Sequence, residues 1–265
     1  MPSRARFIAI VLVAELACFA PSARADTVMR EEPAYPVAYA RRPLTVLQSM
    51  LAPSLGFAYS QVSVGGVTAT GAGLAGGMTL GATDDLELRA VPIAVELTPN
   101  ARYGNPTLGL TYRLTKGDVE AGFRFDATVI TSAPAGAVTT LGVPLLVHLG
   151  RDARVDTGAF LPIRFQNSNR VVGAAVPISI AYNPVDVFYV RAASGVTITS
   201  FAATYPVTFP LILSAGATIP GRRGPALDIE PFFALPTFVH FGPGVDNPIT
   251  NAWTAGVSIT GYGYF

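Results

Sequence analysis

The chain has 265 residues, of which 50% are apolar and 13% charged, and its formal net charge at pH 7 is +1. This balance argues against a nucleic-acid partner, because phosphate binding requires a clearly basic surface. The single cysteine is Cys18, so the chain beyond it can form neither disulfides nor thiolate sites.

The first 25 residues have the pattern of a cleavable export signal. Arg4 and Arg6 precede an apolar run, and Ala23-Arg24-Ala25 supplies the small residues of a cleavage site. A lipidation box at Cys18 is disfavoured, because Glu15 stands where such a box has an apolar residue. Removal of residues 1–25 takes three of the 18 basic and one of the 17 acidic residues, which leaves 15 and 16 and a net charge of −1.

Residues 26–46 are rich in proline, show no periodic pattern, and are predicted to form an extended segment. Beyond them no stretch approaches about eighteen uninterrupted apolar residues, which argues against transmembrane helices. Glycine and proline interrupt residues 47–265 every dozen residues or so, as expected for many short strands in a single all-β domain.

Twelve strands are predicted, with boundaries good to a few residues: 47–60, 71–83, 86–94, 107–115, 119–130, 138–150, 154–165, 171–182, 186–194, 206–219, 226–237 and 250–265. The last shows the clearest period of two, with Val257 and Ile259 on one face and Ser258 and Thr260 on the other. The connections alternate between tight turns and longer loops of about five to twelve residues, too short to fold inward as a plug.

Charged residues within the strands provide a second pattern. Twelve fall on the face opposite the apolar stripe: Glu87, Arg89, Arg113, Glu120, Arg124, Asp126, Arg154, Asp156, Arg164, Arg191, Asp228 and Glu230. An apolar outer face and a charged inner face are what strands between lipid and a wet lumen require. Turn lengths place Arg113 opposite Glu120 and His148 opposite Asp156 as cross-strand pairs.

The terminal residues allow a comparison with a known group. The export signal, the alternating hairpins and the ending Gly261-Tyr262-Gly263-Tyr264-Phe265 resemble the Gram-negative outer-membrane β-barrel (porin-like) superfamily. The resemblance implies a closed antiparallel up-and-down transmembrane barrel in the outer membrane, with residues 26–46 on the periplasmic side. It also implies that Phe265, helped by Tyr264 and Tyr262, is read by the barrel-assembly machinery.

Prolines within the predicted strands leave the strand count open. Each removes a hydrogen-bond donor from a sheet that has no edge, and they are Pro92, Pro144, Pro162, Pro177, Pro210 and Pro231. Either these positions are bulges or several strands are shorter, so ten or fourteen strands remain alternatives to twelve.

The function expected from this pattern is a weakly selective channel for small polar solutes, because charges of both signs line the lumen in equal number. The alternatives are a non-conducting structural or binding barrel (an adhesin or receptor), an outer-membrane hydrolase and a soluble secreted β-sandwich. Oligomeric state is not indicated by the sequence.

An enzyme, a metal and a cofactor are not expected. The chain has two histidines, His148 and His240, and neither has an evident serine partner or zinc-ligand spacing. The glycine-rich stretch from Gly71 to Gly77 lies on a predicted strand with no helix after it, which excludes a phosphate-binding loop.

Overall fold

The computed structural model describes residues 34–265 except 65, 100, 167–168, 202–206 and 242–250. The chain divides into two units, Met1–Pro33 and Ala34–Phe265. The expected export signal and the first part of the expected extended segment therefore lie outside the described residues. In the part that is described, no helix is long and apolar enough to cross a membrane.

The second unit consists almost entirely of β-strands, preceded by one 3-10 turn, η1 (Tyr39–Arg41). The strands are β1 (Met50–Val64), β2 (Val67–Gly81), β3 (Leu86–Thr98), β4 (Arg102–Tyr103), β5 (Thr107–Arg113), β6 (Val119–Ile130), β7 (Gly136–Leu149), β8 (Ala153–Gln166), β9 (Asn169–Val172), β10 (Ala174–Val185), β11 (Phe188–Ile198), β12 (Val207–Gly221), β13 (Gly224–Phe241), β14 (Ala252–Gly261) and β15 (Gly263–Tyr264). The short strands β4, β9 and β15 pair with β3, β8 and β1.

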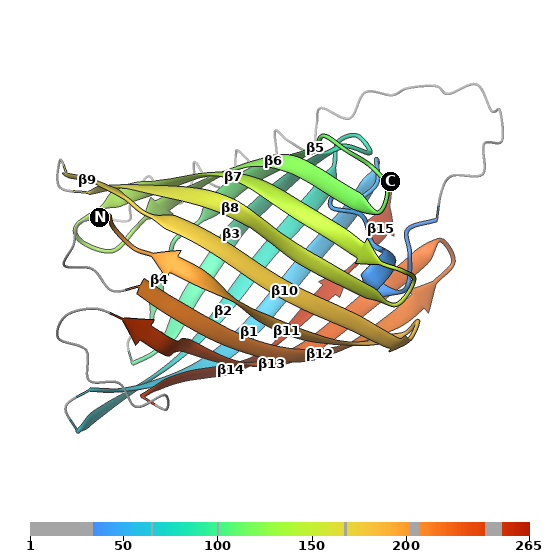
Figure 1. Ribbon diagram of the computed structural model, residues 1–265. Helices are drawn as coiled ribbons and strands as arrows, with labels where there is room; N and C mark the ends of the chain where they lie inside the picture. Colours follow the sequence, from blue (N-terminus) through green and yellow to red (C-terminus); the bar gives the residue numbers. More distant parts are fainter. Residues whose placement is uncertain (1–33, 65, 100, 167–168, 202–206, 242–250) are drawn as a thin grey trace, which may run out of the picture. The chain divides into compact units, whose positions relative to one another are not determined.

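Twelve strands of the described chain form a closed antiparallel barrel (Figure 1). Consecutive strands pair as hairpins, and two further pairings complete the wall. At the first, β1 pairs with β14 over nine positions from Ser54↔Thr260 to Val62↔Ala252. At the second, β8 pairs with β10, from Tyr182↔Ala153 to Ala175↔Phe160. The prediction of a closed twelve-stranded barrel is confirmed, and the alternatives of ten and fourteen strands are excluded.

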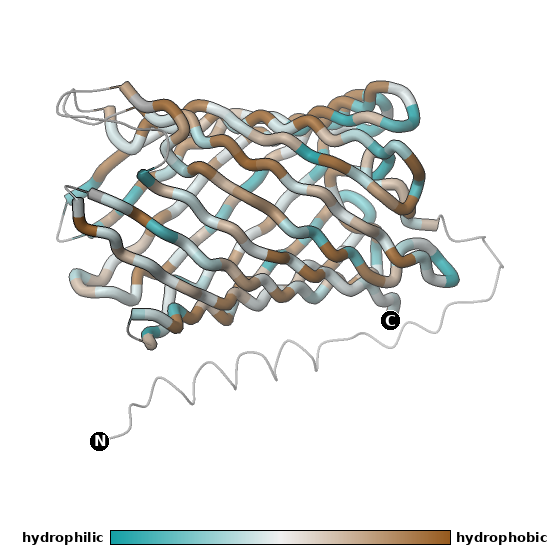
Figure 2. The backbone as a smooth tube through the Cα atoms, turned by 90° about the horizontal axis from the view of Figure 1, so that it is seen from below, coloured by the Kyte–Doolittle hydropathy of each residue, from teal (hydrophilic) through white to brown (hydrophobic). Residues whose placement is uncertain are grey.

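The period of two observed in the sequence separates an outer face from the lumen. Large apolar side chains such as Leu55, Leu108 and Ile259 are exposed on the outside. The hydroxyl of Tyr262 points inward and donates to Asp228 of β13 over 2.6 Å. Along the strands of Figure 2, hydrophobic residues (brown) are interspersed with residues of intermediate hydropathy (pale), and strongly hydrophilic residues (teal) lie mostly toward the two ends of the barrel.

The two ends of the barrel differ. The end at which β1 begins and Phe265 lies, called here the terminal mouth, carries the tight turns 82–85, 114–118, 150–152, 186–187 and 222–223 (Figure 1). At this end the Phe265 amide donates to the carbonyl of Ser49 over 3.1 Å. The opposite end, the loop mouth, carries the connections between β1 and β2, β3 and β5, and the corresponding later pairs.

The strand prolines interrupt individual ladders without ending the strands. At Pro177 the pairing of β8 with β10 skips from Ile178↔Thr157 to Ala175↔Phe160 with no change of register, and the Thr157 hydroxyl donates to the Pro177 carbonyl. At Pro210 the register of β12 and β13 shifts, which marks a bulge. Successive residues of a strand donate to opposite neighbours, so each proline removes a donor from one side only.

The two predicted cross-strand pairs are wrong by two residues. Arg113 lies opposite Gly122, because the Thr115 hydroxyl accepts from the Ala121 amide and widens the connection. His148 lies opposite Arg154, because the turn closes at Leu149↔Ala153. A shift of two residues keeps every side chain on the face on which it was predicted.

Glycine allows one aromatic ring to lie flat on the inner wall. Tyr189 of β11 is fully buried, and a Cβ on Gly216 of β12 would lie 2.0 Å from its Cζ. A methyl group at Gly216 must therefore displace the ring.

We expect Gly216→Ala to lower the free energy of unfolding by about 1–3 kcal/mol, the usual cost of overpacking. Urea unfolding of the detergent-solubilised barrel measures this. Gly263→Ala is the matched control, because nothing lies within 4 Å of a Cβ at that position. Equal effects of the two substitutions would contradict the assigned packing.

Candidate functional site

The terminal mouth is filled by the chain's own N-terminal residues. Residues 34–49, called here the N-terminal plug, enter the lumen before β1 begins, and Tyr35, Ala38, Ala40, Arg42, Thr45 and Val46 are buried there. The 3-10 turn η1 ends at Arg41, because Arg42 precedes Pro43 and adopts the extended backbone that such a position favours. Sequence analysis placed residues 26–46 ahead of the barrel, whereas their described part lies inside it.

Arg42 is the main side-chain anchor of the plug. Its guanidinium forms a bidentate ion pair with Asp228 of β13, and Nη2 lies 3.0 Å from Oδ1. Nη1 also donates to the Tyr262 hydroxyl over 2.9 Å, and Nη2 to the Thr218 hydroxyl over 3.1 Å. The Arg42 and Asp228 side chains are only 3% and 8% exposed. A bidentate pair with this many additional hydrogen bonds is the arrangement that compensates for burying both charges.

Carboxylates of the wall also hold the plug through its backbone. The Leu44 amide donates to Oε2 of Glu120 over 2.8 Å, and the Val46 amide donates to Oε2 of Glu87 over 3.1 Å. Since Glu87 lies on β3, Glu120 on β6 and Asp228 on β13, the plug is attached to widely separated parts of the wall.

The remaining side of the mouth is occupied by β7, β8 and β10. Nδ1 of His148 lies 2.7 Å from the Ala40 carbonyl, and the Ala40 amide donates to Oδ1 of Asn183 over 2.8 Å. Arg154 donates to the Arg42 carbonyl over 2.9 Å. Tyr39 of η1 stacks on Tyr189 with ring centroids 4.5 Å apart. The plug therefore spans the mouth from wall to wall.

Further along the lumen, charges of the wall pair with one another. Asp126 accepts from Arg89 over 2.5 Å and from Arg124 over 2.8 Å. Arg191 lies 2.6 Å from Glu230, to which the Tyr189 hydroxyl also donates.

Most of the twelve charged residues predicted to line the lumen are held by a network of contacts. Within the described chain, every one of the twelve except Arg164 has an ion pair or a hydrogen bond to another part of the lumen. Arg154 pairs with Asp156 of its own strand, and Arg113 reaches Glu120 diagonally over 3.4 Å. Arg164 lies toward the loop mouth and is exposed.

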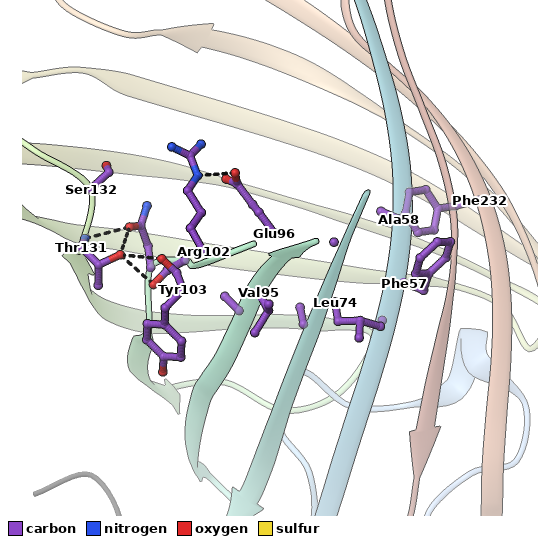
Figure 3. Close-up of a pocket in the computed structure, with 16 residues that line it drawn as sticks. Phe57, Ala58, Leu74, Val95, Glu96, Arg102, Tyr103, Thr131, Ser132 and Phe232 are labelled. Atoms are coloured by element: carbon purple, nitrogen blue, oxygen red, sulfur yellow. Dashed lines mark hydrogen bonds and ion pairs between the residues drawn. The ribbon is translucent and has the colours of Figure 1, made fainter. Parts of the chain in front are cut away.

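A cavity of about 530 Å³ occupies part of the lumen toward the loop mouth (Figure 3). One wall is built of small residues on three adjacent strands: Gly56 and Ala58 of β1, Gly73 and Ala75 of β2, and Ala94 of β3. Phe232 lines it from β13, and the ion pair of Arg102 with Glu96 and the Thr131 hydroxyl provide polar groups. On this side of the plug the lumen thus holds a cavity of mixed polar and apolar character.

The C-terminal residues take different positions. Phe265 is 75% exposed, whereas Tyr262 takes part in the Arg42 network and the Tyr264 hydroxyl donates to the Arg223 carbonyl. His240 lies on β13 opposite Thr208. Asp246, its nearest acidic neighbour in sequence, lies outside the described residues. In the part of the chain described, no cluster of potential metal ligands occurs.

No family model matches the chain, and no curated protein matches it. Among solved structures, the COG4313 outer membrane channel from Pseudomonas putida F1 superposes with a TM-score of 0.57 at 12% identity, over 83% of this chain and 97% of that one. The translocator domain of autotransporter NalP from Neisseria meningitidis gives a TM-score of 0.50 at 13% identity, over 82% and 88% of the two chains. The chain has the fold of an outer-membrane β-barrel. At these identities the likeness extends to the fold alone.

Sequence analysis of the barrel missed the residue on which the site depends. Arg42 lies in a segment without periodicity, and its partner Asp228 is 186 residues away. The one available signal was that Arg41 and Arg42 are adjacent basic residues in a proline-rich segment ahead of a lumen with six carboxylates.

The turn 82–85 adds an ionic contact beside the plug. Asp85 lies 2.9 Å from both Arg113 and Lys116. Burial, the largest single influence, raises the pKa of the Asp85 carboxyl, but the hydrogen bonds from Lys116 and Arg113 together outweigh it and hold the pKa below its ordinary value.

We expect Arg42→Ala to loosen the plug by about 3 kcal/mol, because it leaves the buried Asp228 carboxylate without its cation. Hydrogen exchange of the Ala40 amide, followed by mass spectrometry, should accelerate about a hundredfold. Arg41→Ala is the control: Arg41 pairs with the exposed Asp152 and Asp186, and such pairs contribute ~0–1 kcal/mol. Comparable acceleration in both variants would refute the role assigned to Arg42.

The lowered pKa of Asp85 predicts a pH-dependent contribution to stability. A carboxyl whose pKa is depressed by folding stabilises the fold above its unfolded value of ~3.9, and this contribution is lost as pH falls through the folded value. Asp85→Asn should therefore reduce the free energy of unfolding at pH 7, and its difference from the wild type should shrink as the pH falls below ~3.9. A difference that persists unchanged at pH 2 would show that the contact is not ionic.

Proposed function

We propose that this barrel is an outer-membrane channel for small polar solutes whose terminal mouth is closed by the N-terminal plug. The observation that carries the proposal is the combination of a lumen that holds paired charges and a cavity with a closure that is entirely non-covalent. The described contacts of the plug are hydrogen bonds, ion pairs, ring contacts and apolar packing, so they can be broken and remade without damage to the wall.

The lumen beyond the plug suits hydrated solutes. Its walls carry paired charges of both signs, and the cavity toward the loop mouth can receive a small molecule. The near balance of charges along the whole lumen favours weak overall selectivity. Its width, limited by twelve strands, favours small solutes over macromolecules.

The proposed location is the outer membrane of a Gram-negative bacterium, reached through a cleaved signal at residues 1–25. The exposed apolar face would contact lipid, and Phe265 would serve the barrel-assembly machinery. In this orientation the terminal mouth faces the periplasm, as the short turns at that end favour.

A permanently closed structural barrel is the second candidate. The burial of Arg42 and the breadth of the plug's contacts favour it, since both oppose release. A hydrolase has less support. The described contacts of His148 are the Ala40 carbonyl and Glu120, and neither is a nucleophile that its imidazole could activate.

Deletion of residues 34–46 tests the channel proposal directly. Reconstituted in planar bilayers, the deletion variant should show steady, large conductance steps, whereas the full mature chain should be closed most of the time. Heat-modifiable migration on gels serves as the check that both proteins are folded barrels. Absence of conductance in the folded deletion variant would favour the structural barrel.

A further inference from the structure

The lumen charges balance as a whole, but they do not balance at the terminal mouth. Glu87, Glu120 and Asp228 each bind a group supplied by the plug: the Val46 amide, the Leu44 amide and the Arg42 guanidinium. When the plug leaves the mouth, all three carboxylates lose these donors together.

The donors that remain compensate little of this negative charge. Asp228 keeps two neutral hydroxyl donors, from Thr218 at 2.8 Å and Tyr262 at 2.6 Å. For Glu87, the part of the chain described offers no ion-pair partner. In the described chain, Asp228 therefore retains no cation at ion-pair distance. The arginines near Glu87, which are Arg89 and Arg124, are paired with Asp126.

Two arginines of the same mouth, Arg113 and Arg154, are each bound to a carboxylate outside this set. Arg113 lies 2.9 Å from Asp85, whereas its distance to Glu120 is longer, at 3.4 Å. Arg154 pairs with Asp156. Arg113 is thus shared between Asp85 and Glu120, and Arg154 is held by Asp156, so these arginines offset only part of the negative charge. Since the plug also carries Arg41 and Arg42 away with it, the mouth becomes more acidic when the plug leaves.

We propose that the opened channel is selective for cations and that Glu87, Glu120 and Asp228 are its selectivity-determining residues. The inference rests on the proposed function, since it concerns the conducting state. Rings of acidic side chains concentrate cations and exclude anions where a pore is lined by low-dielectric walls. The same three residues thus hold the plug in the closed state and select small cations in the open state.

The arrangement also predicts that selectivity and closure are coupled through the same side chains. While the plug occupies the mouth and binds these carboxylates, it stands between them and a permeating cation. Exchange of the plug for small cations is therefore a competition at three separate positions of the wall.

The test is the zero-current potential of the folded 34–46 deletion variant in planar bilayers with a KCl gradient. The permeability of K⁺ should exceed that of Cl⁻ by about threefold or more, as expected when an acidic ring lines a pore. Glu87→Gln, Glu120→Gln and Asp228→Asn combined in this variant should bring the ratio close to one. Asp228→Asn alone should lower it, and Asp118→Asn is the matched control, because it removes one charge from an exposed turn of the same mouth.

A ratio at or below one in the deletion variant, or a ratio that the triple substitution leaves unchanged, would overturn the inference. Conductance without cation preference leaves the proposed channel intact, whereas folded protein that never conducts refutes the channel and the selectivity together. If the deletion variant does not fold, the zero-current potential is measured during the open periods of the full-length Arg42→Gln variant. The same ratios then support or overturn the inference.

Discussion

Closure of the sheet between β14 and β1 is the constraint on which the rest of the structure depends. In a bilayer every backbone donor and acceptor must be satisfied within the protein, and a closed antiparallel ladder accomplishes this without an edge. Because β1 and β14 are neighbours, the start of the barrel and its last residue meet at one mouth, where Phe265 binds Ser49. The residues that precede β1 must then either leave that mouth or enter it, and here residues 34–49 enter.

The closed sheet tolerates local irregularities along its strands. Pro177 removes one hydrogen-bond donor from its ladder with β8, and the Thr157 hydroxyl donates to the Pro177 carbonyl instead. Gly216 has no side chain, and the Tyr189 ring occupies the space and supports Tyr39 of the plug. One of these irregular positions, Gly216, therefore also helps to position the plug, through the Tyr189 ring.

Most of the wall could be predicted from the sequence because its rules are local. Alternation along each strand places Arg89 and Asp126 inside and Ile259 outside whatever the register of the hairpin. The pairs Arg113–Glu120 and His148–Asp156 failed as cross-strand neighbours, because Thr115 and Gly150 shape turns whose length is not fixed by periodicity. The plug could not be predicted, since its contacts join Arg42 to Asp228 and Leu44 to Glu120 across most of the chain, with no repeating pattern to signal them.

The breadth of the plug's attachment has a consequence for the order of assembly. Its partners lie on strands from β3 to β13, and Tyr262 follows the last long strand. A chain in which these strands are not yet in place offers the plug only a fraction of its binding surface. We therefore expect the plug to enter the mouth late in folding. A barrel with a missing or misplaced hairpin would leave the mouth open, so a closed mouth indicates that the wall is complete.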